Sequence, residues 1–212
     1  TINDEGWSDT GFDISRISIG GFMGLNSLAV FDKMSSVYVE DNMQKGTIVS
    51  QKGVVYTTTN GRDFNKEYDL NNTSVTITHS TEIDIDHIWA IGNKWESSRK
   101  PFILYKNNMT DGWKEYVFTN ESNYVAREVC FVNPSTGFLL VNKYNTVLAD
   151  VKLYKTTDGG DTWTAVYNGE KFTKFAFKDA MTGWAILDNK IYKTTNGGSE
   201  WVLDYTHDQP IR

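Results

Sequence analysis

The chain has 212 residues, a formal net charge of −6 and an isoelectric point near 5.1. Because affinity for nucleic acid depends on clustered Lys and Arg, this balance argues against a nucleic-acid partner. No apolar run approaches the ~20 residues of a membrane helix, so no transmembrane segment is expected. Aromatic residues at 14%, 17 glycines and 3 prolines suit many short strands joined by tight turns.

The first 35 residues carry an irregular strand pattern. Trp7 follows a Gly-containing turn sequence, and residues 16–19 and 27–31 alternate as strands do. We predict one irregular unit over residues 1–35, within which residues 1–14 supply the strand that closes a ring.

Four clearer units follow in the chain, at residues 36–68, 73–118, 124–167 and 172–205. Each contains a segment that runs from Tyr to Trp or Phe. Tyr154–Trp163 and Tyr192–Trp201 are nearly identical, whereas Tyr56–Phe64 is one residue shorter and Tyr105–Trp113 keeps only its aromatic ends. One structural unit has therefore been copied along the chain.

Each copy has the chemistry of a hairpin turn. Thr and Asp or Asn side chains hydrogen-bond turn backbone, and Gly tolerates a positive φ. The residues expected to build these turns are Thr58, Asn60, Phe64, Thr156, Asp158, Gly160, Trp163, Thr194, Asn196, Gly198 and Trp201. The leading tyrosines lie 49, 49 and 38 residues apart, a spacing that suits a four-stranded sheet repeated around an axis. We predict one all-β domain over residues 1–212, a β-propeller of about five antiparallel blades, with a partial arc of a larger ring as the alternative.

The pattern Thr-x-Asp-x-Gly-x-x-Trp of Thr156, Asp158, Gly160 and Trp163 resembles the Asp-box, or bacterial neuraminidase repeat. Together with the preceding Thr-Gly-Trp-Ala at residues 182–185, the repeat looks most like propellers related to the photosystem II stability and assembly factor. The resemblance implies that the box is a structural element at the blade periphery. It also implies an extracytoplasmic protein, secreted or at a bacterial cell surface.

Two loops are longer than their counterparts, residues 93–100 and 142–150. In the usual blade order both connect a second strand to a third and open on the face opposite the boxes. Long loops on a rigid scaffold carry recognition, and Trp with Arg is favoured at contact hot spots. The candidate binding residues are Trp95, Glu96, Arg99, Lys100, Tyr144 and Asn145. The alternative is that both loops are solvent excursions without a ligand.

Several other residues could suggest a functional site but are explained by structural roles. Residues 79–87 hold two His and three carboxylates, but Glu82, Asp84 and Asp86 share one face of a strand, as in any half-buried strand. No metal site and no cofactor are predicted. Cys130 lies in an apolar strand pattern and is expected to be an inert thiol, and Trp89 and Trp184 are expected to pack between blades.

Two functional classes remain open. The first is a non-catalytic propeller for protein binding, assembly or recognition of a surface ligand. The second is a carbohydrate-binding or glycoside-hydrolysing propeller, in which Trp95 and Tyr144 would line a sugar cleft. No catalytic residues are assigned, because no spacing singles out a carboxylate pair from the 27 acidic residues, and no nucleophile elbow or sialidase Phe-Arg-Ile-Pro signature is present.

Overall fold

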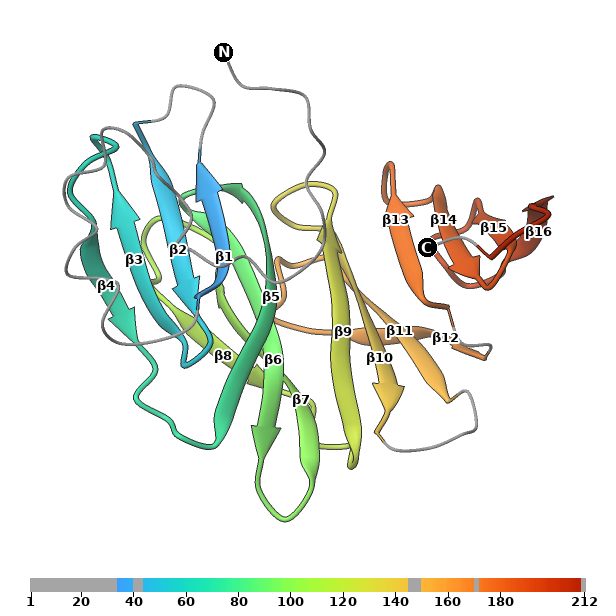
Figure 1. Cartoon of the computed structure of the whole chain (residues 1–212), viewed down its shortest axis with the longest axis horizontal. Coiled ribbons are helices and arrows are strands. Elements are labelled where there is room, and N and C mark those ends of the chain that lie inside the picture. Colours follow the sequence, from blue (N-terminus) through green and yellow to red (C-terminus); the bar gives the residue numbers. More distant parts are fainter. Residues whose placement is uncertain (1–33, 40–43, 145–149, 170–171, 211–212) are drawn as a thin grey trace.

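The computed structural model describes residues 34–39, 44–144, 150–169 and 172–210, which form sixteen strands and no helix (Figure 1). The first sheet contains β1 (Met34–Val39), β2 (Gly46–Ser50), β3 (Val54–Thr58) and β4 (Asn65–Asp69). The second contains β5 (Val75–Asp84), β6 (His87–Trp95), β7 (Arg99–Lys106) and β8 (Lys114–Val117). The third contains β9 (Tyr124–Phe131), β10 (Gly137–Lys143), β11 (Val151–Thr156) and β12 (Thr164–Gly169). The fourth contains β13 (Lys174–Phe177), β14 (Gly183–Leu187), β15 (Lys190–Thr194) and β16 (Val202–Thr206).

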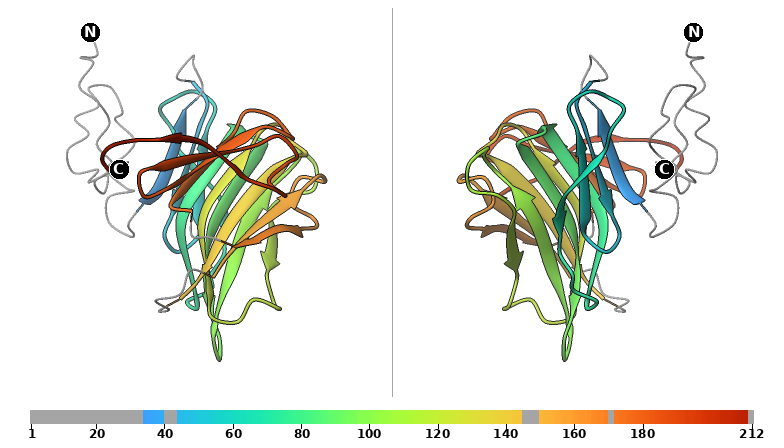
Figure 2. Two further views of the ribbon diagram at one scale, coloured as in Figure 1. Left: turned by 90° about the vertical axis from the view of Figure 1, so that its right-hand side faces the viewer. Right: turned by 90° about the vertical axis from the view of Figure 1, so that its left-hand side faces the viewer.

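Every sheet is antiparallel, with its strands in chain order, so the predicted all-β class of four-stranded antiparallel units is confirmed. The sheets follow one another in chain order from the left to the right of Figure 1 and lie one behind another in the side views of Figure 2. β1 lies near β5, β5 near β9, and β9 near β13, so the first strand of each sheet is the inner one. The irregular unit predicted for residues 1–35 lies outside the described residues, as does the closing strand, except that Met34 and Ser35 begin β1.

The core lies between the sheets. One cluster joins the first and second sheets, a second joins the second and third, and a third joins the third and fourth. The central strands are therefore buried on both faces, as residues 88–92 of β6 and 137–141 of β10 are. β13 instead alternates, with Phe175 and Phe177 buried against the third sheet.

One aromatic contact recurs at two sheet junctions. Trp89 of β6 stacks on Phe131 with ring centroids 3.5 Å apart and planes 7° apart. Phe138 of β10 stacks on Phe177 at 3.5 Å and 4°. The Trp89 indole also donates a hydrogen bond to the carbonyl of Gly159 (2.7 Å). Trp89 therefore packs between sheets, as expected.

The turns between third and fourth strands are held by their own side chains. Thr156 Oγ1 accepts a hydrogen bond from the Gly160 amide (2.9 Å) and donates to Asp158 Oδ1 (2.7 Å). Asp158 also accepts from the amide of Thr162 (2.9 Å), and Trp163 donates to the Gly160 carbonyl (3.0 Å). The backbone there needs glycine, because φ is +75° at Gly159 and +101° at Gly160. We call residues 156–163, and their counterparts in the other sheets, the repeat turns.

The fourth sheet repeats this pattern. Thr194 Oγ1 accepts from the Gly198 amide and donates to Asn196 (both 3.0 Å), and Trp201 donates to the Gly198 carbonyl (2.9 Å). In the first sheet, Thr58 donates to Asn60, which accepts from the amides of Arg62 and Asp63 (2.9 Å each). Only Gly61 has a positive φ there. The shorter turn therefore accommodates Arg62 where the longer turns require a second glycine.

In the second sheet, the strand pairing differs by one residue from the alignment of the repeats that the sequence suggests. Trp89 pairs with Tyr105, whereas Phe138, which makes the equivalent stack, pairs with Lys155. Tyr105 therefore occupies the position of Lys155, not that of Tyr154, and the expected equivalence of the leading tyrosines fails here. One residue of slip turns a strand side chain to the other face of the sheet, and Tyr105 accordingly points toward the third sheet.

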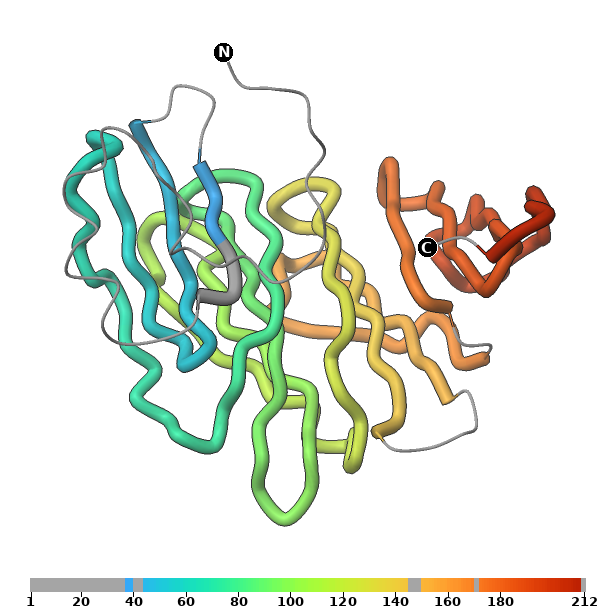
Figure 3. Tube along the Cα trace, in the orientation of Figure 1, coloured from blue at the N-terminus to red at the C-terminus, as the bar shows by residue number. Residues whose placement is uncertain are grey.

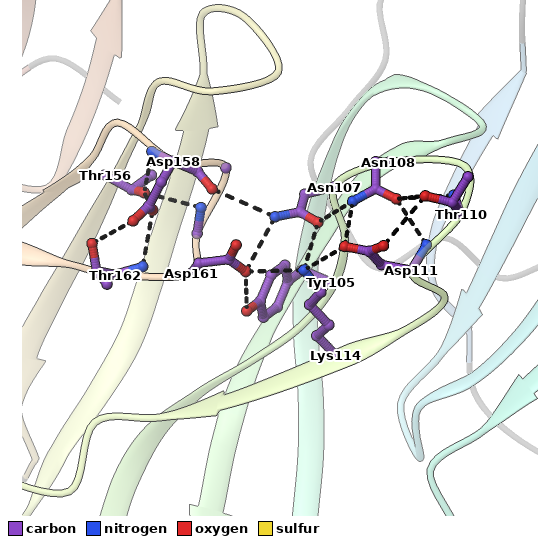
Figure 4. A network of polar contacts seen from close by, with 12 residues as sticks. Tyr105, Asn107, Asn108, Thr110, Asp111, Lys114, Thr156, Asp158, Asp161 and Thr162 are labelled. Carbon is purple, nitrogen blue, oxygen red and sulfur yellow. Dashed lines mark hydrogen bonds and ion pairs between the residues drawn. The ribbon is translucent and has the colours of Figure 1, made fainter.

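With this register, Asn108 takes the place of Asp158 and accepts from the amides of Thr110 (2.9 Å) and Asp111 (2.8 Å). Figure 4 shows the repeat turns of the second and third sheets side by side. Asp161 joins them, because it accepts from Tyr105 (2.9 Å) and pairs with Lys114 (3.2 Å). Burial and this hydrogen bond to Asp161 raise the pKa of Tyr105 well above its usual range. The repeat turns of the second and third sheets are thus linked to each other by polar contacts.

Candidate ligand-binding site

The β6–β7 hairpin projects furthest at the bottom of the view in Figure 3 and carries four of the candidate residues, Trp95, Glu96, Arg99 and Lys100. Trp95 and Arg99 are cross-strand partners. The Arg99 guanidinium lies 3.9 Å from the ring centre of Tyr144 and 5.4 Å from that of Trp95. Asn123 fixes this arrangement, because its amide donates to the Arg99 carbonyl (2.7 Å) and its carbonyl accepts from the Tyr144 amide (2.6 Å). Three of the predicted residues therefore come together as one cation–π cluster.

The other candidate residues have different surroundings. Glu96 forms ion pairs with Lys100 (3.0 Å) and Lys94 (3.2 Å) on the same hairpin. Hydrogen bonds from these two lysines hold the pKa of Glu96 below its usual range. Glu96 and Lys100 thus pair with each other and are not among the residues lining the cavity described next. Asn145 lies outside the described residues.

Beside the cluster is a cavity of about 340 Å³ formed mainly by the inner strands. Its lining residues are Thr78, His79, Asn93, Arg99, Val125, Ala126, Arg127, Glu128, Tyr144 and Lys174. Of the predicted binding residues, Arg99 and Tyr144 belong to this lining, whereas Trp95, 56% exposed, does not. The long loops and the inner strands thus contribute to one site.

Two β-bulges deliver side chains to this cavity. The pairing of β9 with β10 shifts between Leu140 and Val141, which leaves Arg127 as the extra residue. The pairing of β5 with β6 shifts in the same way and leaves Thr78 as the extra residue. A bulge re-aims the side chain of the unpaired residue, and both of these residues line the cavity.

The cavity wall is predominantly cationic. Arg99, Arg127 and Lys174 come from three different strands, β7, β9 and β13. Glu128 is the one carboxylate in the lining; it lies 3.7 Å from Lys174 and accepts from the Phe175 amide (3.3 Å). Arg127 Nε donates to Asn142 Oδ1 (2.5 Å), which leaves its terminal N–H groups for a ligand. Guanidinium groups bind carboxylates in bidentate geometry, so this site suits an anionic ligand.

Sequence reasoning did not identify Arg127, Glu128 or Lys174. One signal was present: Arg127 and Glu128 are consecutive charged residues inside an apolar strand pattern, which interrupts strict alternation. The bulge that this interruption reflects depends on the register in which β9 pairs with β10. Lys174 reaches the cavity because β13 lies against β9 of the preceding sheet.

The carboxylates of the 79–87 segment bind protein groups. Asp84 lies 2.8 Å from His87 Nδ1, and Asp86 pairs with Lys106 (3.0 Å). Within the described ranges no cluster of three or more His, Cys, Asp or Glu could hold a metal ion. Cys130 is partly buried, and that burial raises the pKa of its thiol. In the part of the chain that the structure describes, no helix has the length and apolarity of a membrane span.

Comparison with known proteins shows the fold. No protein-family model matches the sequence, and no curated protein matches it. Among solved structures, YCF48 bound to D1 peptide matches with a TM-score of 0.54 and 12% identity, over 81% of this chain and 54% of that one. YCF48 from Cyanidioschyzon merolae matches at 0.47 and 17%, over 82% and 52%. The GH74 enzyme of Niastella koreensis matches at 0.55 and 11%, over 79% and 28%.

These matches define the class of protein. The described sheets are blades of a β-propeller, like those of YCF48 and of the GH74 enzyme. The chain spans about half the length of the YCF48 chains that it matches. At these identities the likeness shows the fold alone.

Proposed function

We propose that this chain is a non-catalytic binding module that takes an acidic peptide segment of a partner protein into the cavity beside Tyr144. The observation that carries the proposal is the convergence of Arg99, Arg127 and Lys174 on one cavity. The whole chain has a net charge of −6, so this cationic wall is a local reversal of charge, which favours an anionic ligand and steers its approach. The fold-level likeness to a propeller bound to a peptide supports the same class of ligand.

The geometry suggests how the peptide is held. Arg127 supplies a guanidinium fork to a carboxylate, either of a side chain or of a chain terminus. The Arg99 guanidinium lies against the aromatic rings of both Trp95 and Tyr144, which reduces the entropy lost when it forms a bidentate contact. Trp95 then offers its exposed ring to an apolar neighbour of the acidic residue.

The test is titration of fluorescent peptides that contain Asp or Glu, against matched peptides with Asn or Gln, followed by fluorescence anisotropy. Arg127→Ala should weaken binding of the acidic peptide by about tenfold or more. Arg62→Ala is the matched control, because Arg62 lies on the first repeat turn, away from the cavity lining. Equal affinity for acidic and amide peptides, or equal loss in both variants, would contradict the proposal.

A glycan is the second candidate ligand. The favouring observation is the exposed Trp95 ring close to Tyr144 and Arg99, since sugar rings stack on exposed aromatic faces, and a GH74 enzyme shares the fold. Hydrolysis is less well supported, because glycosidases use paired carboxylates and Glu128 is the one carboxylate of the described cavity lining. A glycan array with wild type and Trp95→Ala, paired with hydrolysis assays, distinguishes glycan binding from peptide binding.

We further propose that the repeat turns are Asp-boxes and that the protein works outside the cytoplasm, in secreted form or at the cell surface. The hydrogen bonds of Thr156, Asp158 and Trp163 support the first assignment. The family resemblance supports the second, which cell fractionation with an antibody against the chain would test.

A further inference from the structure

The fourth sheet has an apolar face that points away from the third sheet. Along β14, Ala185 is buried against the third sheet, so Trp184 and Ile186 point to the other side. A shallow depression of about 400 Å³ on that side is lined by Lys174, Phe175, Ala176, Trp184, Ile186 and Ile191. Cross-strand pairing adds Val202 and Tyr205 of β16, 70% and 54% exposed. We call this surface the outer face of the fourth sheet.

Trp184 occupies the register position of the stacked aromatics at the other junctions. Gly183 pairs with Thr194 just as Gly137 pairs with Thr156, and Trp184 follows Gly183 as Phe138 follows Gly137. Phe138 stacks on Phe177 of the next sheet. Among the described residues Trp184 has no such ring upon it, and the expectation that it packs between blades is not met by those residues.

A lysine repeats with the aromatic residue. Lys155 Nζ lies 5.4 Å from the ring centre of Phe138 and donates to the carbonyl of Ala180 in the next sheet (2.8 Å). Lys193 Nζ lies 5.5 Å from the ring centre of Trp184 in the same arrangement. Two elements of an established sheet junction, a ring and an ammonium group, are thus already in place on the outer face.

We propose that the outer face of the fourth sheet docks a further four-stranded blade of the same repeat. The chemistry of that blade follows from the existing junctions. Its first strand ends in an aromatic residue that stacks on Trp184, as Phe177 stacks on Phe138. Three residues further on, a backbone carbonyl accepts from Lys193, as Ala180 accepts from Lys155. Its repeat turn offers a glycine carbonyl to the Trp184 indole, as Gly159 does to Trp89.

The test supplies such a blade. A second copy of residues 170–206 is inserted after Thr206 in the full chain, so that the copied Phe177 can meet Trp184. The expected result is a rise in Tm on the order of 5 °C or more, with slower hydrogen exchange in β14 and β15. Trp184→Asp in the extended chain, and Phe177→Asp in the inserted copy alone, should each remove the gain. An extended chain that gains no stability, or a gain insensitive to Trp184→Asp, overturns the proposal.

The unmodified chain provides a second measurement that does not depend on folding of the inserted copy. Light scattering and cross-linking at Lys193 show whether the outer face is already covered. A dimer that Trp184→Asp dissociates would assign the face to a second copy of this chain. A cross-link from Lys193 to residues 1–33 would assign it to that segment. Either result overturns docking of a further blade, whereas an uncovered face with an accessible Trp184 supports it.

Discussion

Replacement of the first threonine of a repeat turn tests whether these turns are held by their own side chains. Thr156→Val keeps the shape of the side chain and removes its hydroxyl. The Gly160 amide, buried at this site, then loses its acceptor, and an orphaned buried donor costs about 1–3 kcal/mol. The lost donation to the Asp158 carboxylate adds about 1.5 kcal/mol or more, which the added methyl group partly offsets. We expect a loss of about 2–4 kcal/mol in the free energy of unfolding.

The other repeat turns provide an internal ranking. Thr58, Thr156 and Thr194 are 3%, 1% and 1% exposed, so burial does not distinguish them. Thr194→Val loses the same amide contact but only a neutral amide partner, and should cost somewhat less than Thr156→Val. Thr58 has only weak contacts with Asn60, of 3.2 and 3.4 Å, and its replacement should cost under about 1.5 kcal/mol.

Urea unfolding followed by tryptophan fluorescence measures these differences, and a slope that stays constant between variants shows that stability alone has changed. On this basis Thr156→Val lowers Tm by roughly 5–15 °C. A loss of the same size in Thr58→Val would refute the reasoning, because the cost would then reflect burial of the threonine and not its hydrogen bonds.

Three further changes follow from the turns. Trp113→Phe should be neutral or stabilising by up to about 1 kcal/mol in urea unfolding, because the Trp113 indole N–H is buried without a partner among the described residues. Gly160→Ala should cost more than about 1 kcal/mol by the same assay, since φ is +101° and an added Cβ would lie 3.3 Å from Trp89 Nε1. Partial burial acts to raise the pKa of Asp158, but hydrogen bonds from Thr162 and Thr156 outweigh it and hold the pKa below its usual range. The stability that Asp158 contributes is therefore present above the unfolded-state pKa and lost as pH falls below roughly 4, and Asp158→Asn should flatten the Tm-against-pH curve there.

The architecture could be predicted from the sequence because the repeat turns are local. Thr156, Asp158 and Gly160 interact within four residues of one another, so their order in the chain already describes the turn. The slip at Tyr105 could not be predicted, since it depends on which residue of β6 lies opposite. Tyr105 and Trp113 match the two ends of the other repeat segments in sequence. The Tyr105 side chain nevertheless lies on the opposite face of its sheet from the face that Tyr154 occupies.

The site was predictable in part for the same reason. Trp95 and Arg99 lie four residues apart on one hairpin, and a hairpin brings such residues together. Arg127 and Lys174 reach the same cavity because β9 lies against β13 of the next sheet, a contact between sheets that no local sequence pattern specifies. Glu96 and Lys100 looked equally available in sequence, but each has its opposite charge within the hairpin.

The bulge in the inner strands has a consequence for how such a protein can diversify. The same shift in register occurs in β1, β5 and β9. Each of these strands therefore has one bulged residue that does not follow the alternation of side chains between the two faces of the sheet. Thr78 and Arg127 hold this position in successive blades and differ completely in charge. A substitution at this one position of each inner strand can therefore change the charge of the cavity beside Tyr144. The stacked aromatic residues and the repeat turns, which stabilise the fold, need not change with it.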